Sequence, residues 1–396
     1  MDFDFATVPS VIFRHGAARQ LGPLLAERFE TRAALLVTDQ GLRQAGLLDP
    51  ALASLTEAGF TVRMFEDVVA DPPEAIVEAA AAAARELTAN LATQPAASKS
   101  GSLVIGFGGG SSMDVAKLAA ALAGGDQPLK TMYGVGQVDR AASPDRRLPL
   151  VQIPTTAGTG AEVTPVAIVT RGADLKMGVV SPVLYADIAL LDAELTLGLP
   201  PAVTAATGVD AMVHAIEAFT TKHKKNPISD ALALQALGLL AEAVPRAYRN
   251  GSDLEAREKA LLGAMLAGQA FANAPVAAVH ALAYPLGGIF HLPHGLSNAL
   301  VLPHVLRFNM EAAAPLYAAL RPAITPGGAS DAGAFVAEMD ALCEAVGVRQ
   351  RLRDHQISHN DLPRLAEDAM KQTRLLTNNP REVTYEDALA IYAAAL

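Results

Sequence analysis

A long run without charged side chains constrains the fold of this chain more than any other feature. Residues 260–306 contain no Asp, Glu, Lys or Arg. A run of this kind is buried either in a protein core or in a lipid bilayer. Prolines at positions 275, 285, 293 and 303, together with four histidines, divide it into pieces too short to span a bilayer. We therefore expect residues 260–306 to form the core of a globular domain.

The first half of the chain alternates short β-branched runs with Ala-rich runs of helical period, which is typical of a parallel sheet covered by helices. The expected strands are residues 34–38, 62–65, 103–106, 150–153 and 188–191, and residues 166–170 and 176–180 are expected to form a hairpin. The expected helices include residues 16–28 and 73–90, and residues 93–101 are expected to form a loop.

The pattern changes at Pro200-Pro201, after which we find helical periodicity and no convincing strand. The expected helices include residues 201–219, 229–249, 253–272, 297–308, 332–346 and 385–395. A chain of 396 residues is long enough for two domains. We therefore predict a boundary near residues 195–200, with an α/β domain at 1–198 and an all-helical domain at 199–396.

The composition indicates a globular protein, because 51% of the residues are hydrophobic and 18% are charged. A net charge of −10 argues against nucleic acid or an anionic membrane as a partner. Cys343 is the single cysteine, so an intrachain disulfide is impossible and a reducing compartment is favoured. The first ten residues lack the basic-then-apolar pattern of a signal peptide. We expect a cytoplasmic protein.

One carboxylate and three imidazoles form a candidate metal site. Asp210 and His214 are one helical turn apart on one helix face. His280 is expected late in a second helix that ends near residues 285–288, and His294 at the start of a third. These ligand types suit Fe(II) or Zn(II). The alternative is that the histidines are core residues that only form hydrogen bonds.

A glycine-rich turn forms a candidate phosphate site. Gly108, Gly109 and Gly110 lie between an expected strand and an expected helix, where the helix N-terminus offers unpaired N–H groups to an anion. A tight turn without a ligand is the alternative. On the same helix, Asp114 and Lys117 have the spacing of a surface ion pair.

Two further features could contact a nucleotide. Thr155, Thr156 and Thr159 belong to a Gly-containing, flexible loop that could bind phosphate or ribose oxygens, or could be an ordinary loop. Asp39 follows the first expected strand, where doubly wound folds place an acid for the adenosine ribose. It could equally be a turn residue.

Four motifs in the same order resemble those of the iron-containing (group III) alcohol dehydrogenases, over essentially the whole chain. They are GGGS-x-x-D-x-A-K at 108–117, PTTAGTG-x-E-V-T at 154–164, the Asp210/His214 pair, and the pair His280/His294, the latter within PHG-x-x-N. The resemblance implies a dehydroquinate-synthase-like fold, with a Rossmann-like N-terminal α/β domain and an all-α C-terminal domain. It also implies a homodimer.

The resemblance assigns roles to individual residues. It implies that the metal ligands are Asp210, His214, His280 and His294. It implies that NAD is bound by Asp39, Gly108, Gly109, Gly110, Ser111, Asp114, Thr155, Thr156, Thr159 and Lys176. Two positions depart from the family pattern, since this chain has Ala161 where many members have serine and Tyr284 where many have histidine.

The expected reaction is hydride transfer between NAD and a small alcohol, giving an aldehyde or ketone, with a divalent metal ion as Lewis acid. Within the same fold, a metal-independent maleylacetate-type reductase and a hydroxyacid–oxoacid transhydrogenase are alternatives. The intact set of four ligands argues against a metal-free enzyme and against a non-catalytic binding protein. A dehydroquinate-synthase-like lyase would need basic residues for a phosphorylated substrate, and residues 260–306 have none.

Two residues are candidates for proton transfer. Tyr284 follows His280 by one helical turn, so its ring is expected on the same face. We predict that it orients the substrate oxygen by a hydrogen bond, and that His291, three residues before His294, carries the proton to solvent. The alternative for Tyr284 is a core tyrosine.

Overall fold

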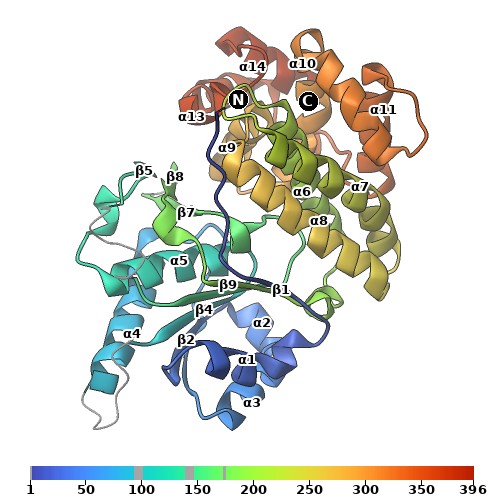
Figure 1. The fold of residues 1–396 in the computed structure, drawn as a ribbon. Helices are drawn as coiled ribbons and strands as arrows, with labels where there is room; N and C mark the ends of the chain where they lie inside the picture. The colour runs from blue at the N-terminus through green and yellow to red at the C-terminus, as the bar shows by residue number, and fades with distance from the viewer. Residues whose placement is uncertain (1, 93–100, 139–146, 173–174) are drawn as a thin grey trace. The chain divides into compact units, whose positions relative to one another are not determined.

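A computed structural model describes residues 2–92, 101–138, 147–172 and 175–396 (Figure 1). Most of the loop expected at 93–101 lies outside the described residues. The chain forms two compact units. The sheet unit comprises Thr7–Thr156 and Ala161–Thr196, and the helical unit comprises Met1–Ala6, Ala157–Gly160 and Leu197–Leu396. Neither unit is continuous in sequence, unlike the predicted segments 1–198 and 199–396.

The sheet unit is built on a six-stranded parallel sheet with the order β1-β9-β6-β4-β2-β3. Its strands are β1 (Val11–Phe13), β2 (Ala33–Val37), β3 (Thr61–Phe65), β4 (Leu103–Gly108), β6 (Leu150–Pro154) and β9 (Ile188–Leu191). The five predicted strands are confirmed. β1 was missed, because three residues are too few to show a period of two. The central strands are buried on both faces, which explains their continuous apolar runs.

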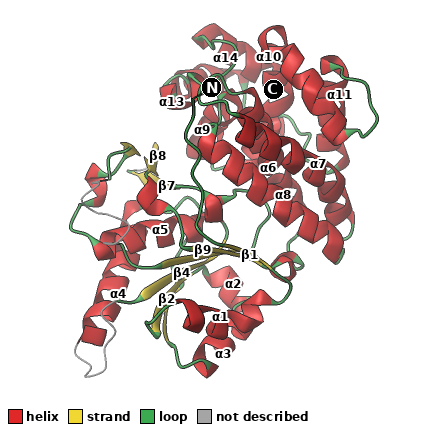
Figure 2. Cartoon of the chain, viewed as in Figure 1, coloured by secondary structure: helices red, strands yellow, loops and turns green. Residues whose placement is uncertain are grey.

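A second, three-stranded sheet has the order β5-β8-β7, from β5 (Gly134–Val135), β7 (Val166–Arg171) and β8 (Leu175–Val180). The predicted hairpin is confirmed as the antiparallel pair β7 and β8. All strands in the described residues belong to the sheet unit (Figure 2).

The sheet unit also contains helices, most of which pack against the main sheet. They are η1 (Ala17–Gln20), α1 (Leu21–Arg28), α2 (Gln40–Gln44), α3 (Asp49–Glu57), α4 (Glu74–Ala92) and α5 (Gly110–Gly124). Short 3-10 turns are η2 (Leu129–Thr131), η4 (Ala161–Val163), η5 (Pro182–Leu184) and η6 (Ala193–Thr196). The helix predicted at 16–28 is divided into η1 and α1, because the backbone of Gln20 leaves the helical region at φ −116°.

The helical unit contains no strand in its described residues. Its helices are α6 (Pro201–Thr220), α7 (Pro227–Arg249), α8 (Leu254–Asn273), α9 (Ala278–Phe290), α10 (His294–Ile324), α11 (Ala332–Ala345), α12 (Leu362–Ala369), α13 (Thr373–Leu376) and α14 (Tyr385–Ala395), with 3-10 turns η7 (Leu352–His355) and η8 (His359–Asp361). Most of the uncharged run 260–306 is buried in α8, α9 and α10, as predicted.

Two helix boundaries differ from prediction because prolines were given too much weight. The helix break falls at Pro275, between α8 and α9, so His280 lies in the first turn of α9 rather than late in a helix. α9 continues through Pro285 to Phe290, and α10 runs through Pro303 and two further prolines. An internal proline removes one backbone hydrogen bond. Burial of these apolar helices in the core offsets that loss.

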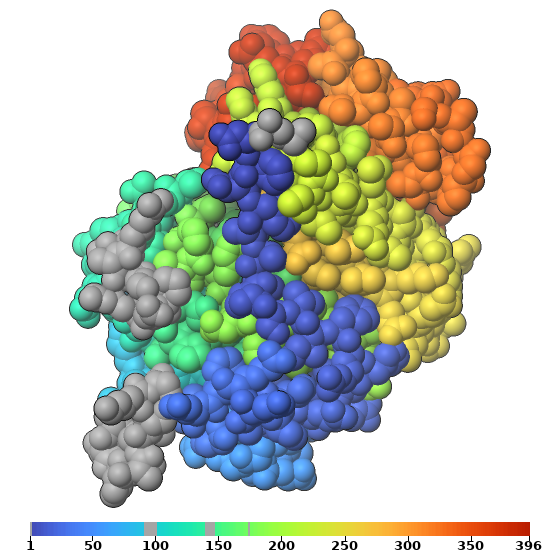
Figure 3. Space-filling model, in the orientation of Figure 1, coloured from blue at the N-terminus to red at the C-terminus, as the bar shows by residue number. Residues whose placement is uncertain are grey.

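α7 is long and apolar enough to cross a membrane. α8 and α9 would also be long and apolar enough if they formed one span, but a bend of 106° separates them. α7 instead packs against α6 and α8 as part of a bundle. Its Glu242 accepts a hydrogen bond from Lys259 of α8 at 2.6 Å, and its Arg246 contacts Glu255 of α8 at 3.1 Å. Both helices reach the molecular surface (Figure 3). These ionic contacts fit a bundle helix with one apolar face.

Candidate dinucleotide pocket and metal centre

The sheet unit has a pocket of about 670 Å³ at the carboxyl ends of three strands. Its lining comes from the segments after β2 and β3 and from the start of α5. The lining residues are Asp39, Gln40, Gly41, Glu66, Asp67, Val68, Val69, Ala70, Gly109, Gly110, Ser111 and Ser112. In open α/β sheets, ligands bind at this edge. The structure thus brings Asp39, Gly109, Gly110 and Ser111 of the predicted cofactor set together in one pocket.

The glycine turn has no room for a side chain at Gly108, the last residue of β4. A Cβ on Gly108 would lie 2.7 Å from the Ser112 Oγ. Gly109 is the N-cap of α5 and provides no side chain to cap it. The first N–H groups of α5 therefore face the pocket without a capping side chain, an arrangement that fits the pyrophosphate of a dinucleotide.

Three carboxylates also line this pocket: Asp39, Glu66 and Asp67. Asp39 is both a pocket residue and a turn residue, since its Oδ1 accepts the Leu42 N–H at 3.0 Å and caps α2. Its backbone also forms a β-bridge with Asp67. Glu66 and Asp67 were missed, although their position directly after a predicted strand could have indicated them. Carboxylates accept hydrogen bonds from ribose hydroxyls and repel an additional phosphate.

Asp114 and Lys117 form the predicted pair, but the predicted surface position is wrong. Lys117 is fully buried, and its Nζ lies 3.4 Å from the Asp114 Oδ1. The Lys117 Nζ also donates to Thr164 Oγ1 at 3.2 Å and to the Val166 carbonyl at 2.6 Å. Asp114 Oδ2 accepts the Ile168 N–H at 3.0 Å. These bonds connect α5 to β7 and its preceding turn, and both Asp114 oxygens have protein partners.

The remaining cofactor candidates of the sheet unit do not line the pocket. Thr155 donates its backbone N–H to the Gly108 carbonyl at 3.0 Å, which ties the end of β6 to the glycine turn. Thr156 is the nearest side chain to the position of a Cβ on Gly109, at 3.9 Å. Lys176 on β8 forms an ion pair with Asp71 at 2.7 Å.

Thr159 belongs to a short segment of the helical unit, and that segment is closely packed rather than flexible as predicted. A Cβ on Gly158 would lie 2.7 Å from the Cβ of Thr207 on α6. A Cβ on Gly160 would lie 2.5 Å from the Cα of Gly268 on α8. The glycines of this loop therefore serve close contact between backbones.

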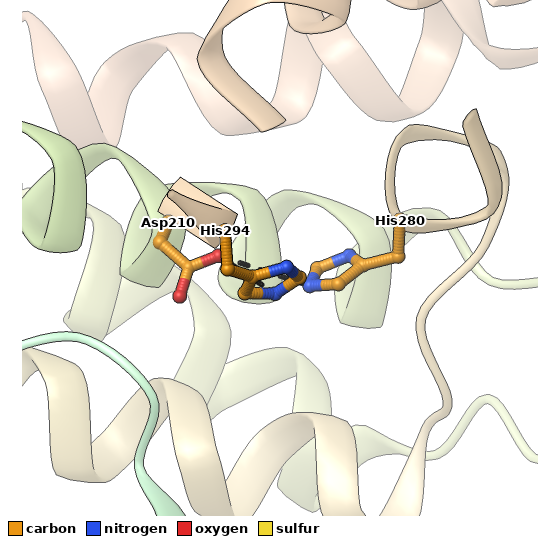
Figure 4. Close-up of side chains that lie close together, drawn as sticks. All are labelled: Asp210, His280 and His294. Atoms are coloured by element: carbon orange, nitrogen blue, oxygen red, sulfur yellow. Dashed lines mark ion pairs between the residues drawn. The ribbon is translucent and has the colours of Figure 1, made fainter. Parts of the chain in front are cut away.

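Three of the predicted metal ligands come together in the helical unit. Asp210, His280 and His294 offer ligand atoms that all lie within 4.8 Å of one another (Figure 4). The Asp210 Oδ1 lies 3.9 Å from the His280 Nε2 and 3.6 Å from the His294 Nε2. Asp210 and His280 are buried, and the His294 side chain is 33% exposed. A site with one partly open side can admit a substrate oxygen.

Close helix contacts position this cluster. Asp210 lies in the buried middle of α6, and His294 is the first residue of α10 after Pro293. A Cβ on Gly295 would lie 2.3 Å from the carbonyl oxygen of Ala206 on α6. The glycine of the PHG motif therefore allows the start of α10 to approach α6 closely.

His214 lies beside the cluster but outside the group of three. Its ring stacks on His280 and on Phe271, with centroid distances of 4.7 Å and 4.3 Å. Burial lowers the pKa of His214 to about 3, although Asp210 has the opposite effect. The imidazole is therefore neutral near pH 7, and its buried Nδ1 has no hydrogen-bond partner among the described residues. A neutral buried imidazole fits a metal ligand.

Asn298 contacts all three members of the cluster and was missed as a site residue. Its Nδ2 donates to the Asp210 Oδ1 at 2.5 Å and lies 3.4 Å from the Nε2 atoms of His280 and His294. Burial alone would raise the pKa of Asp210, but the three histidines and Asn298 outweigh it and lower the pKa. Asp210 is therefore an ionised carboxylate, which a divalent cation requires.

Glu217 of α6 was also missed. It accepts hydrogen bonds from the Val279 N–H at 2.7 Å and the Ala277 N–H at 2.9 Å, and its Oε2 lies 2.6 Å from the His280 Nδ1. Its position, seven residues after Asp210 on the same helix face, was a usable signal. Together, the buried Asp210 carboxylate and the imidazoles of His214, His280 and His294 fit a single divalent ion such as Fe(II) or Zn(II).

The candidates for proton transfer lie on α9. The Tyr284 ring is 6.0 Å from the His294 ring, between centroids. His291 is the exposed C-cap of α9, with a left-handed backbone at φ 55°.

Comparison with known proteins assigns the family. Residues 9–193 match the model for iron-containing alcohol dehydrogenase, and residues 204–396 match the model for the C-terminal part of the Fe-containing alcohol dehydrogenase family. Long-chain-alcohol dehydrogenase 1 of Geobacillus thermodenitrificans is 38% identical over 390 residues, covering 96% of this chain and 93% of the relative.

Solved structures give the same answer. A 1,3-propanediol oxidoreductase matches with a TM-score of 0.91 and 33% identity over 100% of both chains. The sulfoacetaldehyde reductase of Bifidobacterium kashiwanohense, in complex with NAD+, matches with a TM-score of 0.85 and 29% identity, covering 100% of this chain and 99% of the reductase. These matches identify the chain as an oxidoreductase. The chain belongs to the iron-containing alcohol dehydrogenase family, as its motifs implied.

A pH-dependent stability is expected from Glu162 in η4. Burial raises the pKa of Glu162 to about 7 from an ordinary value of 4.5, although Lys117 has the opposite effect. An acid with a raised pKa favours folding while it is neutral, so this contribution is complete below pH 4.5 and is lost as the pH rises through 7. Relative to Glu162→Gln, the wild type should lose roughly 3 kcal/mol of stability over this range.

Melting temperatures of the wild type and Glu162→Gln between pH 4.5 and 8 measure this difference. The exposed Glu57 provides the control, since Glu57→Gln should melt in parallel with the wild type throughout. Parallel curves for Glu162→Gln and the wild type would show that Glu162 does not titrate in this range.

Proposed function

We propose that this chain is an NAD-dependent alcohol dehydrogenase in which Asp210, His214, His280 and His294 hold one divalent ion, Fe(II) or Zn(II). The observation that carries the proposal is the meeting of an ionised carboxylate and imidazoles from α6, α9 and α10 inside one compact unit. When bound, the ion supplies Lewis acidity to a substrate oxygen, and the nicotinamide takes or gives the hydride.

The chain's own residues prepare this chemistry. Asp210 provides negative charge in a buried position, and Asn298 fixes the orientation of its carboxylate. Burial of Asp210 and His280 excludes water, which strengthens electrostatic interactions with the substrate. Tyr284, beside His294, orients the substrate oxygen, and the exposed His291 exchanges the proton with solvent.

The dinucleotide is proposed to bind at the pocket of the sheet unit. Its pyrophosphate would lie at Gly108, Gly109, Gly110 and Ser111, with Thr155, Thr156 and Thr159 in the second loop as further contacts. Asp39 would accept hydrogen bonds from the adenosine ribose. Asp114 and Lys176 complete the proposed set, with Asp114 holding α5 in place and Lys176 on the β8 edge. The NAD+ complex of the related reductase supports NAD as the cofactor.

The substrate is proposed to be a small alcohol and its aldehyde or ketone. The relatives are named for long-chain alcohols, 1,3-propanediol and sulfoacetaldehyde, so membership of the family does not select one. A panel of primary alcohols, diols and 2-hydroxy acids, with their carbonyl partners, identifies it. We also propose a cytoplasmic homodimer, and sedimentation measures the subunit number.

Loss of Asp210 should release the metal. Asp210→Ala leaves only neutral imidazoles, so Zn(II) or Fe(II) should dissociate and activity should fall at least 100-fold, because an ionised ligand is removed. Metal content and activity are measured after reconstitution. The ion pair between the half-buried Asp368 and the exposed Lys371 offers a control, and Asp368→Ala should retain the metal content and the activity. Full activity of metal-free protein would instead favour a maleylacetate-type reductase.

Asp39 should select NAD over NADP. Asp39→Gly removes a carboxylate that repels a 2′-phosphate, and glycine is also an acceptable N-cap for α2. We expect the ratio of kcat/KM for NAD to that for NADP to fall by at least tenfold. A wild type that uses both cofactors equally well would contradict this role. Unchanged selectivity in Asp39→Gly would assign the preference to other residues.

Substitutions of Tyr284 and His291 should have different effects on the kinetics. Tyr284→Phe removes one hydrogen bond to the substrate oxygen, so kcat/KM should fall about tenfold. His291→Ala should remove an ionisation near neutral pH from the pH–rate profile, because histidine is the side chain that titrates there. If both variants keep the wild-type rate and profile, the proton leaves by another route.

A further inference from the structure

We infer that Glu217 is a positioning residue that fixes the tautomer of His280, with the proton on Nδ1 and the lone pair of Nε2 directed at Asp210 and His294. The inference rests on the proposed function only where it treats His280 as a metal ligand. The tautomer itself is a property of this chain's own residues.

The contacts of Glu217 define its role. The carboxylate is buried on α6, and its Oε2 lies 2.6 Å from the His280 Nδ1. The same Oε2 accepts the Ala277 N–H at 2.9 Å, and Oε1 accepts the Val279 N–H at 2.7 Å. No Lys or Arg forms an ion pair with Glu217 among the described residues. Hydrogen bonds from N–H groups therefore compensate the buried carboxylate.

A carboxylate at this position determines which ring nitrogen of His280 carries the proton. Each oxygen of Glu217 already accepts a backbone N–H, so the carboxylate acts as the acceptor toward the Nδ1 that faces it and this Nδ1 is the donor. A neutral imidazole has one N–H, and the Nε2 then keeps its lone pair. That Nε2 is the atom 3.9 Å from the Asp210 Oδ1. Carboxylates that orient metal-binding histidines in this way strengthen metal binding.

The same carboxylate also starts α9. Ala277 is the N-cap of α9 and has no capping side chain of its own. Glu217 accepts two of the N–H groups that every helix N-terminus leaves unpaired. His280 lies in this first turn, so Glu217 fixes both the position of its backbone and the orientation of its ring.

The first test is the tautomer of His280 in the metal-stripped wild type. Protein labelled with 15N-histidine gives imidazole nitrogen signals that separate Nδ1–H from Nε2–H, and the loss of one set in His280→Asn assigns them. We expect the Nδ1–H form. A proton on Nε2 would overturn the inference, and this test requires no variant of Glu217.

The second test uses two replacements of Glu217. Glu217→Met keeps the volume and removes both acceptors, so the Nδ1–H form should no longer dominate and Zn(II) affinity should fall about 10- to 100-fold. Glu217→Gln keeps one acceptor oxygen and should lie between Met and the wild type. Zn(II) affinity is measured by competition with a chromophoric chelator.

A matched control separates these effects from general damage. Glu242 on α7 is an exposed carboxylate that pairs with Lys259 and Arg246, so Glu242→Met should keep the wild-type tautomer and Zn(II) affinity. Glu217→Met with an unchanged tautomer and a Zn(II) affinity within twofold of the wild type would overturn the inference. A wild type with the Nδ1–H form that binds no Zn(II) would refute the proposed metal centre and leave the role of Glu217 in place.

Discussion

Two carboxylates on one face of α6 have to be accommodated in a core that includes residues 260–306, which contain no Asp, Glu, Lys or Arg. Asp210 and Glu217 are both buried, and residues 260–306 supply only neutral partners. Each carboxylate therefore organises N–H donors around itself. The partners of Glu217 lie at the start of α9, and those of Asp210 include Asn298 on α10. The arrangement of the three helices follows from the need to compensate these buried charges.

Opposite electrical features meet in the pocket of the sheet unit. The N-terminus of α5 carries the positive end of a helix dipole, while Asp39, Glu66 and Asp67 bring negative charge. A ligand that matches both features has an anionic group close to hydroxyl groups, and the pyrophosphate and ribose of the proposed dinucleotide meet this requirement.

Much of the fold could be predicted from sequence because its signals are local. The buried strands have continuous apolar runs. The proposed ligands Asp210 and His294 are indicated by helix spacing and by a proline at a helix start. Predictions failed where tertiary packing decides. α9 and α10 continue through prolines because burial outweighs a lost hydrogen bond, and Lys117 is buried because partners distant in sequence surround it.

The prediction missed several site residues for the same physical reason, namely that tertiary packing decides their role. Glu66, Asp67, Glu217 and Asn298 are polar residues whose roles depend on neighbours brought close by folding. A glutamate on a helix is normally exposed, so its type alone gives no indication of burial. For Glu217, the only usable signal in the sequence was that its spacing places it on the same helix face as Asp210 and His214.

The division of the chain into units has a consequence for its synthesis. The chain passes from one unit to the other at four points, after Ala6, Thr156, Gly160 and Thr196. Residues 2–6 and 157–160 therefore leave the ribosome before the helices against which they pack, Gly160 against Gly268 and Ala6 against Asn273. The sheet unit can fold first as a nascent domain. The helical unit includes segments that are synthesised long before its helices. Neither unit can therefore be expressed as one continuous piece of this chain.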